Sequence, residues 1–137
     1  MDLIINRTLA DVEKALEYQA RGFQNLTESE KAEWLSGLKG SYNYTDLNRV
    51  ESAVKMVANA INVQVVTKTD WNTEDIFTLS DMERYLGNIR VIGGKNVPES
   101  MVGMTYETAN QIEQSLIDLL TFTGTWHPCG EVYCGEV

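Results

Sequence analysis

The stretch TDLNRVESAVKMVANAI, residues 45–61, carries the clearest structural signal in the chain. Its apolar residues recur every three or four positions, which places them on one face of an α-helix. This stripe consists of Leu47, Val50, Val54, Val57, Ala58 and Ile61. Thr45 is a common helix N-cap and Asn62 is a natural stop. The sequence therefore predicts a helix between these two residues, with one buried face.

Four other segments repeat this pattern of a capping residue followed by spaced apolar residues. The first expected helix covers 9–22, after Thr8 with Asp11 in the capping box, and a shorter second helix follows Thr27 with Glu30 and ends at Gly37 and Gly40. Another expected helix follows Ser80 with Glu83 and ends at Gly93-Gly94. The last expected helix follows Thr105 and ends near Gly124. The expected stripes are Leu9, Val12, Leu16, Ala20 and Phe23; Trp34, Leu35 and Leu38; Met82, Tyr85, Leu86 and Ile89; and Ala109, Ile112, Leu116, Leu119 and Leu120.

Helices of this kind pack their apolar stripes against one another, and short connections favour antiparallel neighbours. We therefore expect a mainly α fold, an irregular bundle of about five helices over residues 1–125. A short extended C-terminal strand follows over residues 126–137. The burial signal is weakest in the second helix.

Two segments outside the helices have local signals of their own. Residues 63–69, VQVVTKT, are rich in β-branched side chains and fit either a short strand or an extended connector. Asp70 and Trp71 predict a turn in which the indole covers the bundle. Residues 42–46, YNYTD, predict a turn followed by a helix N-cap.

Composition narrows the classes of partner. A chain of 137 residues forms one domain and buries a core without disulfides or metals as staples. Its twenty acidic and eleven basic residues give a net charge of −9, which repels phosphate backbones and anionic lipids. We therefore expect neither nucleic acid nor a membrane as partner. The first apolar run is too short for a signal peptide, so synthesis in a cytoplasm is expected.

The sequence contains no recognisable catalytic motif. His127 is the single histidine, so any serine or cysteine triad would have to use it. The acidic pairs Glu74 with Asp75 and Glu28 with Glu30 are typical of the solvated surface of an acidic protein. We therefore expect no enzymatic activity and no cofactor.

The C-terminal residues CGEVYCGEV, 129–137, repeat a four-residue word around a tyrosine. In an extended strand, residues five apart face opposite sides at about 16 Å, which excludes a disulfide between Cys129 and Cys134. His127 and these two cysteines are the candidate metal ligands, but a zinc site usually draws a second ligand pair from elsewhere. An unpaired strand instead offers its edge to another chain. The expected docking residues are Trp126, Val132, Tyr133 and Val137.

Four stretches of the chain together resemble a known family. They are INRTLADV (5–12), KGSYNYTDLNRV (39–50), KTDW (68–71) and GEVYCGE (130–136). The likeness is to small proteins encoded with the tail and fibre genes of phages and prophages of Gram-positive bacteria, and it runs from near residue 4 to the C-terminus. Relatives tend to have serine where this chain has Cys129 and Cys134, which argues against an obligatory metal site or disulfide.

The resemblance implies a virion component rather than an enzyme. The expected role is a baseplate or tail-fibre adaptor, part of a symmetric oligomer, that binds other phage tail, baseplate or fibre proteins. Two alternatives stay open: a head-to-tail connector, and an acidic regulatory binding protein that mimics nucleic acid. A peptidoglycan hydrolase would suit a phage, but the sequence offers it no site residues.

Overall fold

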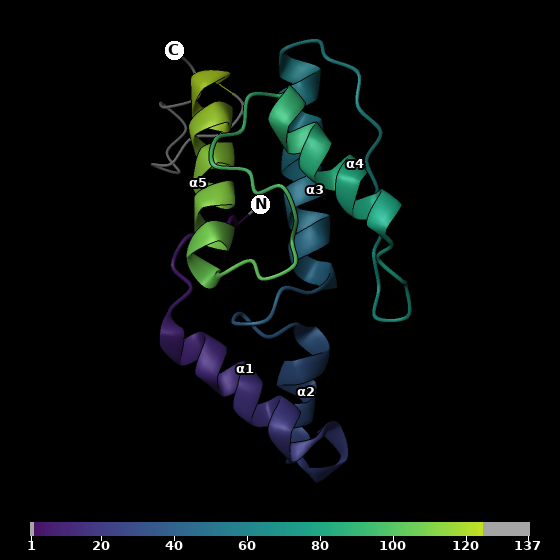
Figure 1. Ribbon diagram of the computed structural model, residues 1–137, viewed down its shortest axis with the longest axis vertical. Coiled ribbons are helices and arrows are strands. Elements are labelled where there is room, and N and C mark those ends of the chain that lie inside the picture. The colour runs from purple at the N-terminus through teal and green to yellow at the C-terminus, as the bar shows by residue number, and fades with distance from the viewer. Residues whose placement is uncertain (1, 125–137) are drawn as a thin grey trace.

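The computed structural model describes residues 2–124, which form five α-helices and one short 3-10 helix (Figure 1). The elements are α1 (Leu9–Arg21), η1 (Phe23–Asn25), α2 (Glu28–Ser36), α3 (Tyr44–Ala60), α4 (Leu79–Val91) and α5 (Tyr106–Phe122). The predicted mainly α class is confirmed. Residues 63–69 are an extended connector, and residues 2–124 contain no strand. The strand expected over 126–137 lies outside the described residues.

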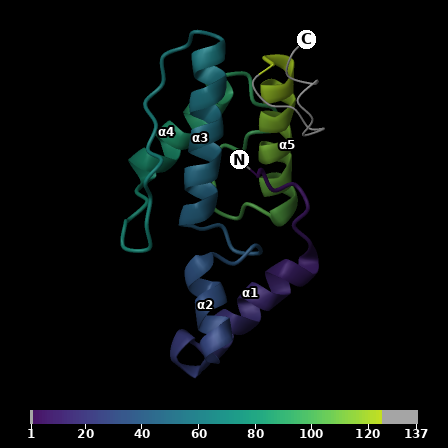
Figure 2. The same ribbon diagram turned by 180° about the vertical axis from the view of Figure 1, so that it is seen from behind.

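The helices divide into two regions, which we call the body and the arm (Figures 1 and 2). The body consists of α3, α4, α5 and the N-terminal residues 2–8; the arm consists of α1, η1 and α2, which extend away from it. The centre of the body core is formed by Val50, Val54, Val57, Tyr85, Leu86, Ile89, Ile112, Leu116 and Leu120. The arm core is much smaller: Ala15, Tyr18, Leu26 and Leu38, with Phe23 and Trp34 packed against them.

The three body helices all run from the end of the body that faces the arm toward the opposite end, with α4 inclined to α3 and α5 (Figures 1 and 2). The connectors 61–78 and 92–105 therefore return along the body before the next helix begins. This corrects the expectation of antiparallel neighbours, which holds for short connections and here describes only α1 and α2. No helix among the described residues is long and apolar enough to cross a membrane.

The cap residues explain where the helices begin. Thr8, Thr27 and Thr105 cap α1, α2 and α5 as predicted. The predicted caps of the other two helices, Thr45 and Ser80, are wrong.

In both helices the capping box starts two residues earlier. Asn43 caps α3, with its side chain accepting from the Thr45 amide and the Asp46 carboxylate accepting from the Asn43 amide. Thr78 with Asp81 does the same for α4. The turn and N-cap predicted within residues 42–46 are thus confirmed, with Asn43 as the capping residue.

The predicted stripes of α3, α4 and α5 face the body core, except that Ile61 is 40% exposed. The stripe predicted for α1 is wrong at Leu9 and Leu16, which are each 58% exposed while Ala15 and Tyr18 are buried. Phe23, the last residue of that stripe, packs against the arm core as expected. The Tyr18 hydroxyl donates to Glu33 of α2 at 2.7 Å, which turns that face of α1 toward the arm core. None of the residues of α2 is fully buried, in line with its weak signal.

Candidate functional site: two buried ion-pair clusters and an aromatic cleft

The first candidate site is a set of charged side chains inside the body, which we call the Arg7 cluster. It consists of Arg7 from the N-terminal segment, Asp46 and Arg49 from α3, and Asn110 and Glu113 from α5. Arg7, Asp46 and Glu113 are at most 4% exposed. Charged groups are rarely buried this deeply unless they are paired.

Every charge of the Arg7 cluster faces an opposite charge. Arg7 Nη2 donates to Asp46 Oδ1 at 2.9 Å and to Glu113 Oε2 at 2.5 Å. Arg49 donates from Nε and Nη2 to the two oxygens of Glu113, at 2.7 and 2.8 Å, and also contacts Asp46. Burial lowers the pKa of Arg49, but its bonds to Glu113 and Asp46 outweigh burial and raise that pKa above its usual range. Two guanidinium groups therefore offset two carboxylates.

The same cluster fixes the N-terminal segment to α5. The Ile4 amide donates to Glu113 Oε1 at 2.8 Å. The Arg7 backbone forms two bonds with the Asn110 side chain, accepting at 3.0 Å and donating at 3.1 Å. Residues more than a hundred positions apart are thereby joined through one polar centre.

A second polar centre, the Glu51 cluster, consists of Asn48, Glu51, Trp71 and Arg84. Glu51, on the inner side of α3, is 2% exposed. Its carboxylate accepts from Trp71 Nε1 at 2.8 Å and from Arg84 Nη1 and Nη2 at 2.6 and 3.0 Å. It also accepts from the Lys68 amide at 3.0 Å. The bond to Glu51 is the main reason that the pKa of Arg84 is raised.

Asn48 completes the Glu51 cluster by binding the backbone of Trp71. Its amide nitrogen donates to the Trp71 carbonyl at 2.9 Å and its oxygen accepts from the Trp71 amide at 2.6 Å. The prediction that Trp71 covers the bundle is confirmed, since the residue is 5% exposed. The predicted turn lies slightly later, at residues 73–74.

Two tyrosines connect these clusters. The hydroxyls of Tyr42 and Tyr85 are 2.5 Å apart, and burial raises the pKa of both. The Arg7 guanidinium lies over the Tyr42 ring at 5.7 Å, while Phe77 makes edge contacts with Tyr85 and Trp71. Polar and aromatic contacts therefore run without interruption from Arg7 to Glu51.

The clusters are closed in the part of the chain that the structure describes. Every buried side-chain nitrogen and oxygen there has a hydrogen-bond partner, and no group of three or more His, Cys, Asp or Glu side chains is arranged to hold a metal ion. Together they tie the N-terminal segment, the connector 61–78 and the three body helices into one unit. This arrangement is typical of a cluster that stabilises the fold.

An aromatic cleft lies beside the clusters, between the start of α3 and the loop 71–77. Its volume is about 360 Å³. The apolar wall is formed by Tyr42, Tyr44, Leu47, Trp71, Phe77 and Met101, and the polar rim by Asn43, Asn72, Thr73 and Asp75. This cleft thus combines aromatic and polar side chains on one concave surface.

The residues that sequence reasoning selected as sites all belong to the tail. The docking residues Trp126, Val132, Tyr133 and Val137 and the candidate ligands His127, Cys129 and Cys134 lie outside the described residues, so these assignments stay predictions. The expected surface acids are exposed, with Glu28 at 95%. Glu30 is partly covered because it pairs with Arg21 at 2.9 Å.

The buried acids were missed, although the sequence contains a signal for them. Glu51 lies four residues after Leu47 and three before Val54, and Glu113 lies three residues before Leu116, so both acids fall on predicted apolar stripes. An acid in such a position needs a buried cation as partner. The acidic residues considered from the sequence are neighbours in the chain and not single acids on an apolar stripe.

Comparisons of the chain with protein-family models, with curated proteins and with solved structures found no match. The residues and their geometry are therefore the basis for inferring a function.

Proposed function

We propose that the chain is a non-enzymatic structural component of a phage tail, a baseplate or tail-fibre adaptor that docks onto neighbouring virion proteins. It is made in the cytoplasm of the bacterial host and incorporated into the virion as part of a symmetric oligomer. Its helical body positions the surfaces that contact those neighbours. The C-terminal tail, with Trp126, Val132, Tyr133 and Val137, supplies one of them.

One observation carries the proposal: the stretches that resemble phage tail proteins supply several of the residues that fasten the body. Arg7 belongs to the first stretch, Asp46 and Arg49 to the second and Trp71 to the third. The likeness thus falls on the framework of the fold. This supports a shared architecture with those proteins, and through it a shared structural role.

The closed clusters also favour a scaffold over a reactive site. A carboxylate that works as an acid or base needs access to substrate in a cleft. Glu51 and Glu113 instead each accept four hydrogen bonds from neighbouring segments. Removing either group should damage folding before it damages any chemistry.

The proposal is tested by locating the protein in intact particles. Antibodies raised against the purified chain, detected by immunogold electron microscopy, should label the distal end of the tail. Labelling at the joint between head and tail would support the connector alternative. Absence from purified particles, with the protein present in infected cells, would overturn the structural role and favour the regulatory alternative.

A truncation tests the role of the tail separately. Deleting residues 126–137 should leave a helical monomer by circular dichroism that no longer enters particles. Replacing Val132 and Tyr133 with serine in the full chain should weaken incorporation without changing helicity. A truncated chain that is unfolded, or one that assembles normally, would contradict this part of the proposal.

A further inference from the structure

The aromatic cleft has a rigid, preformed wall. Trp71 is held by Glu51 and Asn48, and Phe77 packs edge-on between Trp71 at 5.4 Å and Tyr85 at 5.8 Å, measured between ring centroids. The volume of about 360 Å³ is near the lower end of the range for ligand pockets, roughly 300–1,000 Å³. It therefore has room for one or two side chains and not for a long ligand.

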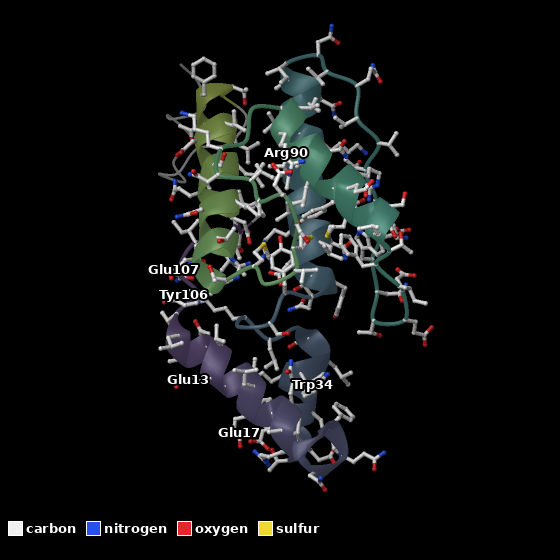
Figure 3. The ribbon with its side chains drawn as sticks, in the orientation of Figure 1. Glu13, Glu17, Trp34, Arg90, Tyr106 and Glu107 are labelled. Atoms are coloured by element: carbon white, nitrogen blue, oxygen red, sulfur yellow. The ribbon has the colours of Figure 1, made fainter. Side chains whose placement is uncertain are left out.

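The loop that borders the cleft exposes apolar surface outward. Ile76, immediately before Phe77, is 81% exposed, and Leu79 at the start of α4 is 67% exposed. Large apolar side chains next to a cleft are typical of protein-contacting surfaces. Figure 3 shows the side chains of this region, at the end of α4 opposite to the labelled Arg90.

The charge around the loop is predominantly negative. Asp70, Glu74 and Asp75 lie along it with one cation, Lys68, whose Nζ is 2.8 Å from Asp70 and 3.8 Å from Asp75. Two of these three carboxylates pair with the single ammonium group, and the charge of Glu74 has no such partner among the described ion pairs. A segment that docks here gains from carrying positive charge beside its apolar anchor.

We propose that the aromatic cleft receives a single aromatic or large aliphatic side chain from a partner protein, in a segment where lysine or arginine flanks that side chain. This inference rests on the proposed function in taking the partner to be another virion protein. The anchor contacts Tyr44, Phe77 and Met101, and the flanking cations face Glu74 and Asp75. Aromatic side chains in desolvated pockets, surrounded by a polar rim, contribute most of the affinity at such interfaces.

A sugar ring is the alternative occupant for a cleft with aromatic walls and a polar rim, but the geometry of this cleft favours a sugar less. Sugars stack on an open aromatic face. Trp71 is only 5% exposed, and the Lys68 ammonium lies 5.0 Å from its ring centroid. The indole therefore offers little flat surface to a saccharide.

The test is a titration of the full-length, ¹⁵N-labelled chain followed by amide chemical shifts. The probe is the peptide acetyl-Lys-Trp-Lys-amide, compared with acetyl-Lys-Ala-Lys-amide, acetyl-Glu-Trp-Glu-amide and N-acetylglucosamine. The Lys-Trp-Lys peptide should produce saturable shifts at the amides of Asn72, Phe77 and Met101. The other three probes should bind at least tenfold more weakly. Equal binding of the alanine peptide, shifts confined to other regions, binding of the sugar alone, or no saturable shift would each overturn the proposal.

Two surface variants with matched controls sharpen the test. Glu74→Gln removes one charge from the loop beside the cleft and should weaken binding of the lysine peptide by about two- to fivefold, the usual effect of one exposed charge. Glu13→Gln makes the same change on α1, where Figure 3 places Glu13 in the arm, and should leave binding unchanged. Ile76→Ala should weaken binding of the lysine peptide. Leu16→Ala, the matched control on the arm, should leave binding unchanged. Equal effects in both regions would overturn the assignment.

This result and the location of the protein in particles are independent measurements. Failure of the peptide to bind would remove the cleft as an anchor site and leave the immunogold result intact. Absence from particles together with specific peptide binding would instead remove the virion partner and keep a peptide-binding cleft.

Discussion

The body and the arm place their ion pairs in opposite environments. In the body, Arg7, Asp46 and Glu113 are paired with side-chain exposures of 2% or less. In the arm, Arg21 pairs with Glu30 and Glu17 while its own side chain is 35% exposed, and Lys14 pairs with Glu33 at 48% and 41% exposure. The body also has the larger apolar core.

This difference determines how each region should respond to substitution. Removing one partner of a buried pair leaves a charge without compensation inside the protein, whereas an exposed pair contributes little because water solvates both groups. The arm therefore depends on its small core, its caps and its close contact with the segment 37–43. Regions with few buried contacts open at lower free energy than the rest of a protein. We expect the arm to unfold locally while the body stays folded.

Glu113→Gln should have the largest effect. The substitution keeps the size of the side chain but leaves two guanidinium groups facing one carboxylate, and it should lower the free energy of unfolding by about 3–5 kcal/mol. Urea denaturation followed by circular dichroism measures this change. Glu107→Gln is the control, because this residue is exposed in the first turn of the same helix and should change stability by less than about 1 kcal/mol. Similar midpoints for the two variants would refute the role of the Arg7 cluster.

Gly40→Ala should unfold the arm selectively. A Cβ at Gly40 would lie 2.0 Å from the Asp11 carbonyl oxygen, so the segment 37–43 would have to move away from α1. We expect a cost of about 1–3 kcal/mol, seen as loss of the Trp34 indole signal by NMR under conditions where the Trp71 signal persists. Trp34 lies in the arm (Figure 3) and Trp71 in the body core.

Gly87→Ala is the matched control for Gly40→Ala. Gly87 lies within α4 with nothing within 4 Å of the added Cβ, so alanine should stabilise the body by about 0.5–1 kcal/mol. If Gly40→Ala behaved like Gly87→Ala, or lowered the stability of both regions equally, the arm and the body would not be separate units of stability.

The sequence predicted the body better than the arm, for a physical reason. The apolar stripes of α3, α4 and α5 pack into one large core, so the residues selected by their spacing are also the buried residues. In α1 the buried face is set by Ala15 and Tyr18, one small and one with a polar end, and spacing alone favoured Leu9 and Leu16 instead. A helix that packs against a small core buries few residues, so its hydrophobic periodicity is a weak guide to its buried face.

The polar sites were less predictable still. Arg7 and Glu113 are 106 positions apart, and nothing local in either segment indicates that they meet. They meet because the N-terminal segment lies against α5, where the Ile4 amide binds Glu113 and the Arg7 backbone binds Asn110. The predicted tail sites are a different case, because residues 126–137 lie outside the described residues.

Asn43→Ala tests the corrected start of α3 and should have an intermediate effect. It removes the cap on α3 and the two bonds from its amide nitrogen to the Leu38 and Ser41 carbonyls, which join the body to the end of the arm. We expect a loss of about 1–2 kcal/mol by urea denaturation. Thr45→Ala, the cap expected from sequence alone, should cost clearly less. The reverse order would restore the original assignment of the cap.

Acidification should produce the smallest effect, and in the arm. The Arg21 guanidinium, followed by the Thr27 amide, lowers the pKa of Glu30 from 4.5 to about 2. Because the folded-state pKa lies below the unfolded one, the contribution of Glu30 is complete above pH 4.5 and is lost as the pH falls toward 2. The melting temperature of the arm, followed by the Trp34 indole signal, should therefore decline through this window.

Glu30→Gln separates this effect from general acid unfolding. The variant should lose part of the decline in the arm's melting temperature, and at neutral pH its arm should already melt slightly earlier than that of the parent chain. Exposed ion pairs are screened by salt, so added sodium chloride should reduce the difference between the two chains. A decline that is equally steep in both chains would mean that Glu30 and Arg21 do not couple the arm to pH, and that the arm depends on its core and caps alone.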